Sequence, residues 1–150
     1  MGIGLGVLLL YQTNKIIMNN SFNFTTLTVR PAAILTNSYV AGTVLGTDTT
    51  ANLEYNSTLI LDVDFTLGSL TTGEIIVEFS NDGTTYYQET IDAVNTSTGI
   101  ITEKPAIRTF GATGKYRMTI PVMDKFIKIS AHGTGTVAGS SMSIVAAVGR

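Results

Sequence analysis

The sequence predicts an all-β protein: an antiparallel β-sandwich of jelly-roll or immunoglobulin-like topology, preceded by an extended N-terminal arm. Three observations predict this class. Apolar and polar residues alternate with a period of two along most of the chain. Glycine-containing turn signals interrupt the alternation at short intervals. Thr, Val and Ile, which favour pleated surfaces, are abundant. Many short strands of this kind are typical of two packed sheets, since a single open sheet would leave its edges exposed.

The expected strands are nine short runs, each with one apolar face. They cover residues 23–30, 38–45, 53–66, 73–80, 84–91, 98–103, 114–120, 125–132 and 140–148. In the run "TLILDVDF" the alternation turns Leu59, Leu61, Val63 and Phe65 to one face and the two aspartates to the other. The same pattern predicts inward positions at Ile75, Val77, Phe79, Tyr116, Met118, Ile120, Ile127, Ile129, Ala131, Met142, Ile144, Ala146 and Val148.

Turn signals separate these runs. They occur at Thr47-Asp48, Gly68-Ser69, Asp82-Gly83, Thr98-Gly99, Gly111–Gly114 and Gly133–Gly135. The glycine-rich stretch "HGTGTVAGSS" matches no phosphate-binding pattern and stands between two strands, so it is interpreted as a hairpin loop. No linker divides the chain, and residues 22–150 are expected to form one β-sandwich domain.

Residues 1–21 are assigned to an arm or extension outside the core. The apolar run Ile3–Tyr11 is shorter than the roughly 20 residues that span a bilayer. Three interpretations remain open: an arm docking on a neighbouring subunit, a segment upstream of a start at Met18, or a weak signal or membrane-associating segment. No Lys or Arg precedes the run, which disfavours a signal peptide. The arm hypothesis is preferred, and it predicts partner contacts at Leu8, Leu9, Leu10 and Tyr11.

Composition narrows the function classes. Charged residues make up 13% of the chain, against a usual share of about 25%, and the net charge is −2. A nucleic-acid partner is disfavoured because no basic face or basic block is evident. The chain has no cysteine, which rules out disulfides, thiolate zinc sites and a cysteine nucleophile. Its single histidine, His132, rules out a site with several histidine ligands.

No catalytic, metal or cofactor site is predicted. Asp62 and Asp64 share one strand face and could begin a calcium or acid/base site, but a solvated strand face is the preferred interpretation because nothing nearby supplies the loop oxygens that calcium needs. His132 is expected on an outward face, and no nucleophile-elbow pattern accompanies it. Asn81-Asp82-Gly83 matches only the end of a calcium-loop pattern.

The stretch "EFSNDGTTYYQE" is predicted to be a hairpin. Asp82-Gly83 is a strong turn signal because glycine adopts positive φ without a Cβ clash. This register makes Phe79 and Tyr86 a cross-strand core pair. It leaves Asn81, Asp82 and Tyr87 exposed as further partner-contact candidates. The tyrosines also raise an alternative function, a carbohydrate-binding or adhesin module with an aromatic platform, although the chain has no Trp; these tyrosines are Tyr39, Tyr55, Tyr86, Tyr87 and Tyr116.

Four segments in order carry a family resemblance: "ILTNSYVAGTVLG", "VEFSNDGTTYYQE", "GKYRMTIPVMDKFIKISAHGTGT" and "SSMSIVAAVG". The chain resembles, over residues 27–149, the small β-sandwich structural proteins of tailed bacteriophages, found in head decoration, neck and tail. In those proteins an inward-packed aromatic follows the turn glycine, a place that Tyr86 holds here.

The resemblance implies a virion component without enzymatic activity or cofactor. A capsid decoration protein is the first expectation, and a neck or tail component is the alternative. The implied partners are further copies of the chain and other virion proteins, namely the major capsid or tail proteins, with neither nucleic acid nor membrane. Low charge with abundant Thr, Gly and Asn agrees with a homo-oligomer that covers much of its own surface.

Overall fold

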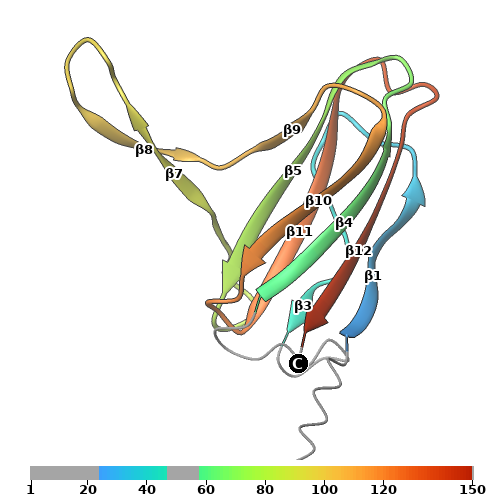
Figure 1. Cartoon of the computed structure of the whole chain (residues 1–150), viewed down its shortest axis with the longest axis horizontal. Coiled ribbons are helices and arrows are strands. Elements are labelled where there is room, and N and C mark those ends of the chain that lie inside the picture. Colours follow the sequence, from blue (N-terminus) through green and yellow to red (C-terminus); the bar gives the residue numbers. More distant parts are fainter. Residues whose placement is uncertain (1–23, 47–57, 150) are drawn as a thin grey trace, which may run out of the picture.

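The computed structural model describes residues 24–46 and 58–149, in which twelve strands and no helix are present. The first six strands are β1 (Phe24–Ala33), β2 (Val40–Ala41), β3 (Leu45–Gly46), β4 (Thr58–Thr66), β5 (Leu70–Ser80) and β6 (Tyr87–Gln88). The others are β7 (Thr90–Val94), β8 (Ile101–Pro105), β9 (Arg108–Phe110), β10 (Gly114–Pro121), β11 (Phe126–Gly135) and β12 (Ser141–Gly149). Figure 1 shows the long strands stacked in layers, with β7 and β8 standing away from them.

Two antiparallel sheets form the body of the molecule. The first has the order β1-β12-β4-β10, and the second has the order β2-β11-β5-β6, with β3 also pairing with β11 and β9 with β5. Side chains from both sheets meet in one core, where Leu61, Ile75, Ile129 and Ile144 are at most 1% exposed. The all-β prediction is confirmed, and the arrangement is consistent with a β-sandwich.

The predicted alternation is confirmed in the long strands. In β4 the residues Leu59, Leu61, Val63 and Phe65 are buried while the aspartates between them reach solvent. In β12 the inward positions, from Met142 to Val148, are at most 1% exposed. Fully burying such a side chain is worth about 1.5–3 kcal/mol relative to exposure, so the period-two pattern sets the inner face of each sheet.

The strand boundaries differ most from the prediction between residues 80 and 110, and the expected strand 38–45 is reduced to the two short strands β2 and β3. The expected strand 84–91 is interrupted, since pairing with β5 stops at Gln88 and a separate pairing begins at Thr90. The expected strand 98–103 begins late because Thr98 and Gly99 belong to a turn. Strand β9 was not predicted. Residues 53–57 of the expected strand 53–66 and the turn signal Thr47-Asp48 lie outside the described residues.

The glycine-rich stretch is only partly a loop, which corrects the hairpin-loop interpretation. Residues 132–135 are paired within β11, and the turn falls at 136–140 with Gly139 at φ 69°. A Cβ on Gly133 would lie 2.8 Å from the Leu70 side chain and 3.1 Å from that of Leu35. This glycine therefore permits close packing inside a strand instead of making a turn.

Candidate interaction surface

A two-stranded hairpin projects from the sandwich. It comprises residues 90–105, with β7 paired to β8 from Thr90↔Pro105 to Val94↔Ile101, and it is called the projecting hairpin below. Figure 1 shows it as the yellow loop reaching outward beyond β9. All five residues of β8 are exposed, and in β7 only Ala93 is half-buried. Neither face of this hairpin is therefore covered by the described residues.

The tip of the projecting hairpin is organised by Asn95. Its side-chain oxygen accepts hydrogen bonds from the backbone N–H groups of Ser97 at 3.0 Å and Thr98 at 3.2 Å. Its carbonyl accepts from the N–H of Gly99 at 2.7 Å, and Gly99 has φ 70°. Asn is favoured here because its short amide satisfies turn N–H groups. The predicted Thr98-Gly99 turn signal is confirmed.

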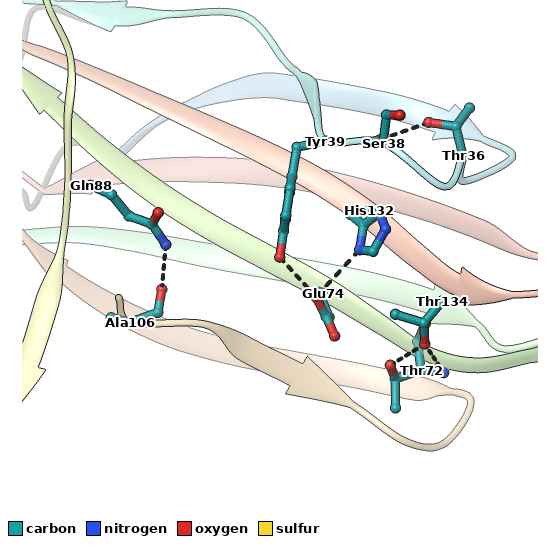
Figure 2. Close-up of polar contacts among 9 residues, drawn as sticks. All are labelled: Thr36, Ser38, Tyr39, Thr72, Glu74, Gln88, Ala106, His132 and Thr134. Atoms are coloured by element: carbon teal, nitrogen blue, oxygen red, sulfur yellow. Dashed lines mark hydrogen bonds and ion pairs between the residues drawn. The ribbon is translucent and has the colours of Figure 1, made fainter. Parts of the chain in front are cut away.

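The base of the projecting hairpin is fastened to the sandwich. Glu89, just before β7, accepts a hydrogen bond at its carbonyl from the N–H of Ala106 at 2.7 Å, and its own N–H bonds the Val77 carbonyl at 2.9 Å. Its carboxylate lies 2.6 Å from the guanidinium of Arg108. Gln88 donates to the Ala106 carbonyl at 3.4 Å (Figure 2). The hairpin thus leaves the sheet from a defined root.

The projecting hairpin exposes large apolar side chains. Ile91 is 55% exposed, Val94 59%, Ile100 59% and Ile101 63%. An isolated two-stranded hairpin is marginally stable in water because it has no second layer to pack on. Clustered exposed apolar side chains of this kind mark interaction sites. Residues 84–91 and 98–103 were predicted to be sandwich strands, so this surface was not predicted. The available signal was four large apolar side chains flanking one turn without continuous alternation.

The predicted contact residues Asn81, Asp82 and Tyr87 are all exposed, with Tyr87 at 72%. They line a shallow hollow together with Phe79 and Asp124. Their predicted role as partner contacts stays a prediction. The other predicted contacts, Leu8, Leu9, Leu10 and Tyr11, lie outside the described residues, as do the rest of the 1–21 arm and Tyr55.

Asp82 organises the loop in which it lies. Its carboxylate accepts hydrogen bonds from the Thr85 N–H at 2.8 Å, the Thr84 N–H at 2.8 Å and the Ser80 hydroxyl at 2.9 Å. These bonds, led by the one from Thr85, hold the pKa of Asp82 well below its usual range because they favour the charged form. The carboxylate is thereby committed to the turn, as the turn hypothesis predicted.

The predicted pairing of Phe79 with Tyr86 is wrong. Phe79 pairs with Tyr87, and the loop from 81 to 86 has six residues instead of a tight turn centred on Asp82-Gly83. One extra residue reverses which side chains point inward. Tyr86 accordingly lies on the outer face of its sheet, where the Lys128 ammonium sits 4.3 Å from the ring centroid.

A polar cluster on the outer face of the second sheet holds the short strand β2 in place (Figure 2). The Tyr39 hydroxyl donates to the Glu74 carboxylate at 2.8 Å, and His132 Nδ1 lies 3.3 Å from the same oxygen. The Tyr39 and His132 rings contact each other at an interplanar angle of 34°, with centroids 4.7 Å apart. Burial first, and then Glu74, raise the pKa of Tyr39 to about 12. His132 lies on the outward face, as predicted.

Asp62 and Asp64 each face a cation of β10. Arg117 makes a bidentate contact with Asp62 at 2.6 and 2.9 Å, and Lys115 lies 3.4 Å from Asp64. The hydrogen bonds from Arg117 lower the pKa of Asp62. These carboxylates therefore act in ion pairs along a solvated strand face. Among the residues that the structure describes, no group of three His, Asp or Glu side chains could hold a metal ion.

No protein-family model matches the chain, and no curated protein sequence matches it. Within residues 24–46 and 58–149, no helix is long and apolar enough to cross a membrane.

Proposed function

We propose that this chain is a non-enzymatic structural protein of a bacteriophage virion, a capsid decoration protein that assembles through contacts with itself and with the major capsid protein. The projecting hairpin carries the proposal. It combines a root held by an ion pair, a hydrogen-bonded tip and four apolar side chains that are at least 55% exposed. Exposed apolar side chains of this kind do not stabilise a monomer in solution, whereas contacts within an assembly would bury them.

The strand order supports a jelly roll over an immunoglobulin-like topology. Taking β2 with β3 and β6 with β9 as interrupted strands, the sheets read as two four-stranded sheets of orders β1-β12-β4-β10 and β2-β11-β5-β6. In chain order, every connection between these eight strands crosses from one sheet to the other except that from β5 to β6. This crossing pattern is that of the double Greek key of viral capsid and lectin domains. Since one fold serves many functions, the strand order supports the class of protein and not its virion position.

The N-terminal arm belongs to the same proposal. Residues 1–21 include the uncharged apolar run 3–11, which suits docking on a neighbouring subunit by strand addition. In a neck or tail component, the alternative position, the arm and the projecting hairpin would serve as contacts with tail proteins instead of the capsid.

Particle association tests the proposal. Antibody raised against the full chain is used for immunogold labelling of purified particles, and regular labelling of the head surface is expected. Labelling at the neck or tail would favour the alternative position. A chain that stays in the lysate and never copurifies with particles would overturn the virion proposal. Deletion of residues 1–21 should then abolish incorporation while the domain of residues 22–150 stays folded, as checked by circular dichroism.

One observation favours a second candidate, an adhesin or carbohydrate-binding module. Tyr87 is 72% exposed beside the polar side chains of Asn81 and Asp82, an arrangement on which a sugar ring could stack. A glycan array probed with the assembled form separates the candidates. Saturable binding that is lost in Tyr87→Ala would favour the adhesin, and an array without binding would count against it.

A further inference from the structure

The two faces of the projecting hairpin carry opposite charge. In an antiparallel pair, directly opposite residues share a face and the faces alternate along each strand. The acidic face therefore holds Asp92 opposite Glu103, with Val94 opposite Ile101 beside them. The basic face holds Ile91 opposite Lys104 and Ala93 opposite Thr102. The bond from the Asn95 N–H to the Ile100 carbonyl extends the ladder by one step, which puts Ile100 on the basic face as well.

The charges on these faces have no partners within the part of the chain that is described. Asp92 and Glu103 point to the same side of adjacent strands, an arrangement of like charges that destabilises a strand pair. Lys104 points to the opposite side and makes no ion pair with either of them. Each face thus presents the charge that the other face lacks.

Both faces also carry exposed apolar side chains. The acidic face carries Val94 and Ile101 toward the tip, and the basic face carries Ile91 toward the root and Ile100 at the tip. The basic face is hollowed as well. Ala93, Thr102, Ile100 and Lys104 help to line a depression that runs toward the tip. Small side chains at its centre leave room for side chains of another hairpin.

We propose that projecting hairpins of successive copies of this chain stack, the acidic face of one on the basic face of the next. The Lys104 ammonium of one copy then lies over the Asp92–Glu103 pair of its neighbour, whose Cβ atoms are about 5 Å apart and can share one cation. The inference rests on the self-assembly in the proposed function and supplies its contact. Because two different faces meet, the contact is heterologous and repeats into a ring or a filament.

Charge selects this stack over a symmetric one. Acidic face against acidic face would gather four carboxylates, and like charges across an interface oppose association. One hairpin face is smaller than a standard protein interface, so a single contact is weak and the stack gains from repetition. Self-association is therefore expected at high protein concentration and low salt, and raising the salt concentration should weaken it.

Charge reversal in the full-length protein tests the stack. Sedimentation velocity is measured over a concentration series for the wild type, for Lys104→Glu and for the double variant Asp92→Lys with Glu103→Lys. Each variant makes the two hairpin faces alike in charge, so each alone should associate at least tenfold more weakly than the wild type. An equimolar mixture of the two variants restores opposite charge at every junction and should recover association.

The controls keep the result interpretable. Lys125→Glu makes the same charge change at an exposed lysine between β10 and β11 and should associate like the wild type. Circular dichroism melts should be alike for all variants, since the altered side chains are exposed. Wild-type behaviour of Lys104→Glu, or a mixture no better than its components, would overturn the stack. A wild-type protein that stays monomeric would also overturn the stack, but it would not contradict the proposal that the chain is a virion protein. Absence of the chain from particles would contradict only the proposed function.

Discussion

Two strand pairs in this protein have the same regular antiparallel register and opposite surroundings. Between β4 and β12, the pairs Leu61↔Ala146 and Val63↔Ile144 are buried beneath the opposing sheet. Between β7 and β8, the pair Val94↔Ile101 is about as apolar but faces solvent. Backbone pairing alone therefore does not bury a strand pair. A second layer does, and the projecting hairpin has none among the described residues.

The largest expected contrast uses one substitution at two sites. Ile75 is fully buried in β5, and Ile101 is 63% exposed in β8. Ile75→Ala should lower the free energy of unfolding by about 2–5 kcal/mol, since it leaves a cavity. Ile101→Ala should change it by less than about 0.5 kcal/mol. Urea denaturation of both variants measures the difference, and equal losses would show that the hairpin is packed on the body.

A glycine pair extends the contrast to added volume. A Cβ on Gly73 would lie 2.6 Å from the buried Phe65 ring, whereas one on Gly111 meets nothing within 4 Å. Gly73→Ala should destabilise the fold by about 1–3 kcal/mol through overpacking. Gly111→Ala is the matched control and should be neutral or slightly stabilising. Thermal unfolding of both variants checks this, and a neutral Gly73→Ala would mean that the ring can move aside.

A substitution at the root of the projecting hairpin should have a smaller effect on stability, confined to the hairpin. Glu89→Gln weakens the half-buried contact with Arg108. Protection of hairpin amides from hydrogen exchange should fall, while the global free energy of unfolding changes by about 1 kcal/mol or less. Asp64→Asn removes the looser and more exposed pair with Lys115, so it is the control and should leave hairpin exchange unaltered. Loss of protection throughout both sheets would contradict a hairpin that opens independently.

The smallest effect concerns the loop of residues 81–86 and its pH dependence. The pKa of Asp82 is depressed in the folded state, so its contribution to stability is present above the unfolded pKa of about 3.9. That contribution is lost as the pH falls through the folded pKa. The difference in urea midpoint between the wild type and Asp82→Asn should therefore be largest near neutral pH and shrink below pH of about 4. A difference that grows on acidification would reverse this assignment.

The sequence predicted the sandwich strands well because burial of one strand face produces an alternation of apolar and polar residues with a period of two. Every residue named for the inner faces of β4 and β12 is buried. It predicted the 81–86 loop less well. The Asp82-Gly83 pair indicates a turn but does not specify how many residues the turn contains. The loop is one residue longer than predicted, so Tyr86 faces outward and Tyr87 lies opposite Phe79. The surface candidates Asn81, Asp82 and Tyr87 are exposed in either register.

The projecting hairpin escaped prediction for a different reason. Its strands contain Ile, Val and Thr like those of the sandwich, so residue type does not distinguish a strand with a covering layer from one without. The irregular alternation beside the turn was the one local sign of the difference. The sequence by itself determined the strand-rich class, the inner faces and most of the turns, since these depend on neighbours along the chain. Only the tertiary structure decided which strands share a sheet, which pair stands alone and which charges face apart, because these depend on contacts between residues distant in sequence.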